Sequence, residues 1–200
     1  MIKSLLHRIM ALPIFYDSMQ AFFGLHKKKK ILQKIIKFED GHQVVLDVGG
    51  GTGLYKDVWP SEYRYICLDS DPVKLLGFSQ KYPSDYKVCA DATQIALKSA
   101  SVDYVFCSSM SHHIHENLLE KIIGDMNRVI KKNGTLVFID AVNIPESRLN
   151  RFLWSLDRGE YPHTYGLLQD IIGKYFNIRR IEKFSIFYDY ILIVATKSSV

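Results

Sequence analysis

The stretch from Val44 to Gly53, VVLDVGGGTG, constrains the fold of this 200-residue chain more than any other. Its first five residues form a short apolar, β-branched run with one acid, which is typical of a strand buried on both faces of a sheet. Four glycines then follow within five residues, where the backbone must turn sharply and approach a ligand closely. We expect a helix to begin at residues 54–58. Strand, glycine turn and helix together predict the first unit of a nucleotide-binding α/β fold.

The spacing of these glycines separates the common nucleotide-binding motifs. A dinucleotide fingerprint has the pattern G-x-G-x-x-G, but Leu54 occupies the place of the third glycine after Gly49 and Gly51. A phosphate-binding P-loop ends in Gly-Lys-Ser/Thr, which this stretch lacks. The pattern present, Asp47-x-Gly49-x-Gly51-x-Gly53, resembles motif I of the class I S-adenosylmethionine-dependent methyltransferases. The alternative is an ordinary glycine-rich turn in another α/β protein, and residues further along the chain must decide between the two.

An acidic pair follows the second expected strand, at residues 63–68. Asp69 lies twenty residues after Gly49, a position from which a carboxylate can accept hydrogen bonds from ribose hydroxyls. Asp71 directly precedes a proline and can instead cap the helix that follows. Asp69 is therefore the expected ribose ligand, with Ser70 beside it in the cofactor site.

A third acid follows the strand expected at residues 86–90. The resemblance implies that Asp91 faces the exocyclic amine of adenine and that the backbone amide of Ala92 meets a ring nitrogen. The alternative is that Asp91 only caps a short turn at residues 94–97. The order of these residues after the two earlier acids favours a cofactor role.

The fourth expected strand, at residues 102–107, leads into the segment SSMSHHI at residues 108–114. This segment resembles the corresponding one in the type 11, or ubiquinone/menaquinone methyltransferase-like, group, where paired histidines often stand. The sequence NRVIKKNG at residues 127–134 resembles that group's turn into the fifth strand. The resemblance covers residues 44–140 and places Ser108 in the cofactor crevice.

The resemblance implies an α/β fold with a Rossmann-like, seven-stranded sheet of order 3-2-1-4-5-7-6, strand 7 antiparallel, and helices on both faces. Ligands of open α/β sheets bind beyond the carboxyl ends of the strands, at the switch point between strands one and four. The implied cofactor is S-adenosylmethionine, which leaves as S-adenosylhomocysteine. The expected cofactor-binding residues are Asp47, Gly49, Gly50, Gly51, Thr52, Gly53, Asp69, Ser70, Asp91, Ala92 and Ser108.

Three histidines, His112, His113 and His163, are the candidates for catalytic groups. A sulfonium methyl is already electrophilic, so such an enzyme mainly aligns the nucleophile and excludes water. A general base is needed only when the acceptor must lose a proton, and histidine suits that task near neutral pH. For each histidine, a structural or surface role is an equal alternative. No metal site is expected, because adjacent histidines point apart and the segment lacks carboxylate ligands.

Basic charge is concentrated at the start of the chain. The net charge is +5, and residues 1–40, with eight Lys/Arg and three Asp/Glu, carry all of it. We expect an N-terminal helical extension, or lid, at residues 1–40, with helices at 4–12, 15–23 and 27–38, and a methyltransferase domain at residues 41–200. The lysines form either a solvated face or a contact for an anionic membrane surface or an acidic carrier protein.

Composition indicates where such a protein works. No apolar run reaches the length of a membrane span, and the N-terminus does not predict a secretory signal. Cys67, Cys89 and Cys107 each fall in an expected buried strand, which fits reduced thiols rather than disulfides. We therefore expect a cytoplasmic protein, with peripheral membrane contact as an option.

Missing motifs narrow the acceptor. No Asp/Asn-Pro-Pro-Tyr follows the fourth strand, which disfavours N-methylation of adenine or glutamine through that motif. No Pro-Cys pair occurs, which disfavours C5 methylation of cytosine in RNA. We expect a methyltransferase acting on a small, hydrophobic or carrier-bound acceptor. The alternatives are a protein that binds S-adenosylmethionine without catalysis, or an RNA methyltransferase, although nucleic acid is not the favoured partner.

Overall fold

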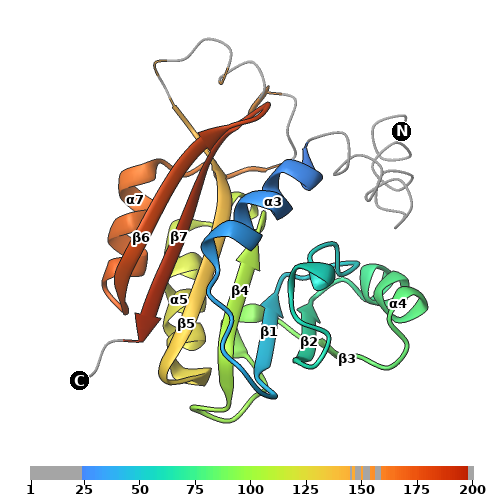
Figure 1. Cartoon of the computed structure of the whole chain (residues 1–200). Coiled ribbons are helices and arrows are strands. Elements are labelled where there is room, and N and C mark those ends of the chain that lie inside the picture. Colours follow the sequence, from blue (N-terminus) through green and yellow to red (C-terminus); the bar gives the residue numbers. More distant parts are fainter. Residues whose placement is uncertain (1–23, 145, 147–149, 151–153, 156–158, 198–200) are drawn as a thin grey trace.

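The computed structural model describes residues 24–144, 146, 150, 154–155 and 159–197 of the chain. It forms one seven-stranded sheet with helices on both faces (Figure 1). The strand order is β3-β2-β1-β4-β5-β7-β6, and β7 is antiparallel to both of its neighbours. The fold class predicted from the sequence is therefore confirmed. The strands are β1 (Val44–Val48), β2 (Arg64–Asp69), β3 (Tyr86–Cys89), β4 (Val102–Ser108), β5 (Ile130–Val142), β6 (Phe176–Ser185) and β7 (Asp189–Lys197).

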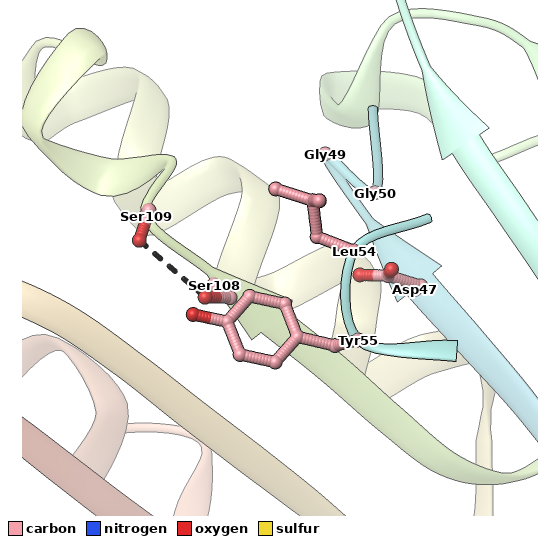
Figure 2. Close-up of a pocket in the computed structure, with 7 residues that line it drawn as sticks. All are labelled: Asp47, Gly49, Gly50, Leu54, Tyr55, Ser108 and Ser109. Atoms are coloured by element: carbon pink, nitrogen blue, oxygen red, sulfur yellow. Dashed lines mark hydrogen bonds between the residues drawn. The ribbon is translucent and has the colours of Figure 1, made fainter. Parts of the chain in front are cut away.

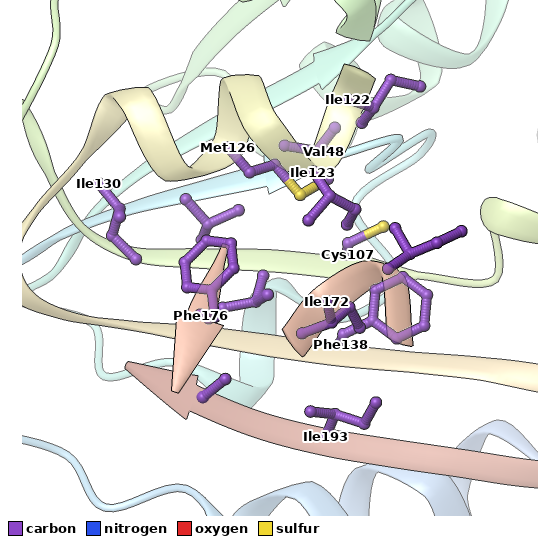
Figure 3. Close-up of a cluster of buried hydrophobic side chains, with 14 of the residues drawn as sticks. Val48, Cys107, Ile122, Ile123, Met126, Ile130, Phe138, Ile172, Phe176 and Ile193 are labelled. Atoms are coloured by element: carbon purple, nitrogen blue, oxygen red, sulfur yellow. The ribbon is translucent and has the colours of Figure 1, made fainter. Parts of the chain in front are cut away.

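Two hydrophobic clusters lie on opposite faces of the sheet, since alternate residues of a strand point to opposite sides. Leu136 and Phe138 of β5 belong to one cluster, whereas Val137 and Ile139 belong to the other. The first cluster packs under α5 (Glu116–Val129) and α7 (Tyr165–Gly173), as Figure 3 shows. The second, richer in aromatic rings, packs under α3 (Leu25–Ile35) and α4 (Pro72–Lys81).

Helix α3 is the described part of the N-terminal extension. It begins at Leu25 and ends at Ile35, slightly earlier at both ends than expected, and Leu25 and Leu32 join the core. The helices expected at 4–12 and 15–23 lie outside the described residues. No helix in the described ranges combines the length and apolar character needed to cross a bilayer.

The prediction of a helix at residues 54–58 is wrong. The glycine turn continues through Tyr55 and ends in a single 3₁₀ turn, η1 (Lys56–Val58). Pro60 disfavours helical backbone at the residue before it, and Trp59 is indeed extended, with φ −93° and ψ 144°. The rings of Tyr55 and Trp59 instead pack edge-on against Phe106 of β4, at centroid distances of 5.3 and 5.8 Å. Aromatic side chains thus cover this part of the sheet.

The cysteines differ from the prediction at one position. Cys67 and Cys107 are buried, but Cys89 is exposed because β3 is the edge strand of the sheet. All three are free thiols. An alternating apolar pattern does not say whether a strand is central or at an edge, so the error has a topological cause.

Candidate active site

An open pocket lies at the carboxyl ends of β1 and β4, where the strand order reverses (Figure 2). Val48 pairs with Cys107, so the residues that follow these two strands flank the same opening. Four of its seven lining residues were expected from the sequence, and Leu54, Tyr55 and Ser109 were not. The lining residues are Asp47, Gly49, Gly50, Leu54, Tyr55, Ser108 and Ser109.

Backbone geometry could have pointed to only one of the three unexpected residues. Ser109 has a φ of +51°, an uncommon conformation for a residue with a side chain and one that often marks a functional turn. Its backbone N–H donates to the carbonyl of Ile139 at 3.0 Å. Leu54 and Tyr55 enter the pocket wall because the chain after the glycines turns instead of forming a helix.

The glycine turn is held to the neighbouring strand through its backbone. The N–H groups of Gly49 and Gly50 both donate to the carbonyl of Leu68, at 2.8 and 3.0 Å. Gly49 has a φ of +75°, which favours glycine. A Cβ on Gly50 would lie 2.6 Å from the Oδ2 of Asp47, closer than atoms can approach. The wall of the pocket therefore consists of bare backbone at these positions.

Asp47 is a buried carboxyl group in the pocket wall. Burial is the largest effect on it and raises its pKa to about 7, with the charge of Asp69 adding to the rise. The hydroxyl of Tyr65 donates to its Oδ2 and opposes the shift. A buried carboxyl with a single side-chain donor is favourably placed beside a cationic ligand, which would stabilise its ionised form.

Asp69 ties the glycine turn to the loop after β2. Its Oδ2 accepts the N–H of Gly51 at 2.9 Å, and its Oδ1 accepts the N–H of Asp71 at 2.8 Å. The carboxylate is buried, at the same sheet edge as the pocket. Asp71 accepts the N–H groups of Val73 and Lys74 and caps α4, as predicted.

Asp91 lies at the carboxyl end of β3, one strand beyond Asp69. Its Oδ1 accepts the N–H of Thr93 at 2.8 Å and so caps the 3₁₀ turn η2 (Ala92–Gln94). This hydrogen bond lowers the pKa of the exposed carboxyl. The structure thus shows the capping role, and the adenine contact of Asp91 and Ala92 stays a prediction.

Seven of the eleven predicted cofactor residues do not line the pocket: Gly51, Thr52, Gly53, Asp69, Ser70, Asp91 and Ala92. Thr52 is fully buried within the glycine turn, and Ser70 is exposed after β2. Ser108, by contrast, lines the pocket, and its hydroxyl lies 3.4 Å from that of Ser109. The serine pair forms the polar side of the opening (Figure 2).

A hydrogen-bonded pair, His112 and Asp140, follows the serine pair, with His112 on the 3₁₀ turn η3 (Ser111–His113). Nδ1 of His112 donates to Oδ1 of Asp140, at 2.6 Å, and both side chains are buried. Oδ2 of Asp140 accepts the N–H groups of Met110 and Ser111 and the Ser111 hydroxyl, at 3.1, 2.6 and 2.6 Å. Burial by itself raises the pKa of Asp140, but His112 and these donors outweigh it and lower that pKa to about 2.

Sequence reasoning missed Asp140 as a site residue. It was expected only as the last residue of the fifth strand. The signal was a lone acid in the apolar run at residues 136–142 of β5, because a buried acid must be paired.

The other two candidate histidines are placed differently. Nε2 of His163 donates to the carbonyls of Ser111 and Ile114, at 3.1 and 3.0 Å, so this buried ring holds η3 in place. His113 is exposed, with its ring centroid 4.1 Å from that of His112. Within the described part of the chain, no three His, Cys, Asp or Glu side chains are grouped as metal ligands.

Comparisons with known proteins agree with this geometry. A family model described as a methyltransferase domain matches residues 46–138, from the first strand through most of the fifth. The chain is 29% identical over 160 residues to the malonyl-[acyl-carrier protein] O-methyltransferase of Marinomonas sp. (strain MWYL1), covering 75% of this chain and 56% of that protein. It is 24% identical over 135 residues to the thiol S-methyltransferase TMT1A of Homo sapiens, covering 63% and 54%. The chain thus spans about half the length of these curated relatives.

A solved structure shares the fold. The geranyl diphosphate C-methyltransferase of Streptomyces coelicolor A3(2) superimposes with a TM-score of 0.73 at 9% identity, covering 86% of this chain and 76% of that one. That protein was solved with Mg²⁺, geranyl-S-thiolodiphosphate and S-adenosyl-L-homocysteine. At this identity the likeness concerns the fold.

Proposed function

We propose that this chain, which carries a class I S-adenosylmethionine-dependent methyltransferase domain, transfers the methyl group of that cofactor to a small, hydrophobic or carrier-bound acceptor. One observation carries the proposal: a pocket with glycine backbone on one wall opens at the switch point between β1 and β4. That is where open α/β sheets bind their ligands.

The pocket residues fit this cofactor. At Gly50 a Cβ would collide with the carboxyl of Asp47, so the chain keeps bare backbone where a ligand must approach. Asp47 offers a carboxylate to the cationic part of the molecule, and the buried Asp69 supports the sugar side of the turn. When bound, S-adenosylmethionine supplies an electrophilic methyl group. The residues proposed to hold it are Asp47, Gly49, Gly50, Gly51, Thr52, Gly53, Asp69, Ser70, Asp91, Ala92 and Ser108.

The chain's own contribution to catalysis is positioning, together with a proton acceptor where the acceptor needs one. We assign His112 as that group, because it follows the pocket-lining Ser108 and Ser109 by three to four residues in the chain. Asp140 fixes the imidazole through Nδ1 and would stabilise the positive charge if the ring took a proton. His163 holds the carbonyls of η3 and so positions His112. His113 stays a surface candidate.

The acceptor class rests on the surroundings of this turn. An aromatic cluster of Trp154, Tyr188 and Tyr190 lies on the β5 side of the site, with the ring of Trp154 5.7 Å from that of His112. The relatives named as malonyl-[acyl-carrier protein] and thiol methyltransferases act, by their names, on carrier-bound or small acceptors.

A second part of the proposal concerns the N-terminal extension. We propose that residues 1–40 cover the acceptor side of the site and contact an acidic carrier or an anionic membrane surface. The exposed lysines of its described part, Lys27, Lys30, Lys34 and Lys37, support this contact. Deleting residues 1–23 should then abolish turnover while cofactor affinity changes less, and unchanged turnover would contradict it.

Calorimetry tests the cofactor assignment directly. The protein is expected to bind S-adenosylhomocysteine and not NADH. Asp69→Ala should weaken that binding at least tenfold, because it releases the glycine turn and removes the ribose acceptor. Asp57→Ala is the matched control, since this exposed acid makes only a surface ion pair with Lys29.

Activity requires a second measurement. Incubation with methyl-labelled cofactor and a cell extract should yield one labelled small molecule or carrier. Cofactor binding without any labelled product would contradict the enzyme and favour a protein that only binds the cofactor. Labelled RNA would favour the nucleic-acid alternative.

A further inference from the structure

One lysine lies where the sequence pattern predicts an apolar side chain. The core-facing residues of α3 are Leu25, Lys28, Leu32 and Ile35, spaced as a helix stripe requires. Lys28 is only 1% exposed, whereas Lys27 and Lys30 on the same helix are exposed. Lysine is almost never fully buried without a partner, so a lysine in the core stripe needs an explanation.

The protein around Lys28 does not neutralise its charge. Nζ lies 5.1 Å from the ring centroid of Tyr190, a cation–π contact. It forms no hydrogen bond or ion pair with any residue that the structure describes. Burial lowers the pKa of Lys28 to about 8 and the charge of Asp140 opposes this, so the ammonium is still charged at neutral pH.

Asp140 is not available as a direct counter-ion. Its Oδ1 is bonded to His112 and to the N–H of Ala141, and its Oδ2 accepts three donors from Met110 and Ser111. The carboxylate is fully buried among these donors. The region therefore holds one anion whose oxygens are saturated and one cation without a close anion.

The sheet register places Tyr190, the ring under this cation, two strands away from Ser108 of the pocket wall. Tyr190, under the ammonium, pairs with Ala141, and Ser108 pairs with Ile139 two residues earlier on the same strand. Both pairs lie at the carboxyl end of β5. Tyr55 of the pocket wall belongs to the same buried cluster as the α3 stripe, so the pocket and Lys28 lie on the same face of the sheet. Figure 1 shows α3 along this side.

Apolar surface flanks the same position. Tyr190 belongs to the cluster of Ala141, Trp154 and Tyr188, with Phe184 stacked on it at 5.4 Å. A cation next to a group of aromatic rings matches a ligand with one negative group on an apolar body.

We propose that Lys28 is a specificity-determining residue that binds a carboxylate of the methyl acceptor, so that the acceptor is an apolar molecule or carrier-bound chain bearing a carboxylate. This deepens the proposed function and rests on it. A carboxylate provides the planar, fully charged group that an isolated ammonium lacks in this site. The aromatic cluster of Trp154, Tyr188 and Tyr190 holds the apolar body.

The charge balance of the reaction supports this choice. A carboxylate oxygen forms a bond to the methyl carbon while the carbon–sulfur bond breaks, and the electron pair of that bond stays on sulfur. One anion and one cation become two neutral products, an ester and a thioether, and no proton is transferred. His112 is then not required as a base. The ester no longer pairs with Lys28, which favours its release.

Binding of simple probes to the protein saturated with S-adenosylhomocysteine tests the inference. Hexanoate and methyl hexanoate have the same apolar chain and differ in charge. The wild-type protein is expected to bind hexanoate at least tenfold more tightly than methyl hexanoate, measured by calorimetry. Lys28→Met should reduce this preference to twofold or less. Lys28→Arg should retain most of this preference, and Lys132→Met, which changes an exposed lysine of β5, should not alter it.

Two further measurements separate the outcomes. Lys28→Met is expected to raise the melting temperature, because it removes a buried, unpaired cation; a lower melting temperature with unchanged probe preference would show a structural lysine and overturn the proposal. Absence of a carboxylate preference in the wild type, through equal or undetectable binding of the two probes, also overturns it. Failure to bind S-adenosylhomocysteine would instead refute the proposed function.

Discussion

Asp47 and Asp140 are both buried acids in central strands, one on the proposed cofactor side of the site and one on the proposed acceptor side, yet their pKa values shift in opposite directions. Burial raises the pKa of Asp47 to about 7, because it has one side-chain donor, Tyr65, and is repelled by Asp69. Burial acts on Asp140 as well, but His112 and the donors of η3 lower its pKa to about 2. The donors around a buried carboxyl, rather than its depth, decide its charge.

The two sides of the site differ in the same way in their construction. The cofactor side consists of backbone: bare glycines and N–H groups bonded across to Leu68 and Asp69. The proposed acceptor side consists of side chains from distant segments: His112 is hydrogen-bonded to Asp140, and the charge of Asp140 acts on Lys28. The first arrangement tolerates little added volume, and the second tolerates little change of charge.

The largest expected effect is on the acceptor side. Asp140→Asn removes the charge that pairs with His112 and organises η3, and it should lower the free energy of unfolding by about 3 kcal/mol at pH 7. The folded pKa of Asp140 is depressed, so its stabilising contribution is present above about pH 4 and is lost as pH falls toward about 2. The difference between wild type and variant, followed by denaturant titration, should therefore shrink below pH 4. A constant difference would contradict the lowered pKa of Asp140.

The next effect is on the cofactor side and is steric. Gly50→Ala places a Cβ 2.6 Å from Asp47 and 2.7 Å from the Sγ of Cys67, and it should cost about 1–3 kcal/mol of stability. Binding of S-adenosylhomocysteine should weaken at least tenfold, measured by calorimetry. Gly166→Ala is the matched control, because a Cβ there meets nothing within 4 Å. Equal effects of both substitutions would show that the pocket wall does not depend on bare backbone.

A smaller effect tests the raised pKa of Asp47. The carboxyl of Asp47 ionises near pH 4 in the unfolded chain but only near pH 7 in the folded protein. The free energy of unfolding therefore falls between about pH 4 and about pH 7, and it does not fall further from this cause above pH 7. Asp47→Asn removes this titration, so its stability relative to wild type should increase over that range, opposite in sign to Asp140→Asn. Affinity for S-adenosylhomocysteine should rise from pH 6 to pH 8 in the wild type and stay flat in the variant.

The smallest expected effect is in the rate of thiol labelling. Burial raises the pKa of both Cys67 and Cys107, so in a Cys89→Ser background neither should react with a maleimide until the structure opens. Cys67 Sγ contacts the carbonyl of Gly51 at 3.6 Å. S-adenosylhomocysteine should therefore slow labelling of Cys67 severalfold more than that of Cys107. Equal slowing of both would indicate that the glycine turn opens only with the whole domain.

The fold and the glycine turn were largely predictable from the sequence, whereas the contacts of individual residues with the cofactor stay a prediction. The glycine turn, the spacing to Asp69 and the cap at Asp71 are patterns within a short part of the sequence. Hydrogen bonds between residues 2 and 18 positions apart form them in the structure. The failures also have local causes that the pattern did not express. Pro60 ended the helix expected after the glycines, and the edge position of β3 exposed Cys89.

The sequence by itself determined the class of fold and the glycine turn, because these depend on residues close together in the chain, and its resemblance to a known family predicted the strand order. Only the tertiary structure decided that Asp140 is a buried carboxylate hydrogen-bonded to His112 and that Lys28 lies buried over the ring of Tyr190. Those residues are separated by 28 positions in one pair and by more than 160 in the other. The burial and charge that give them their chemistry exist only once the sheet has brought the segments together.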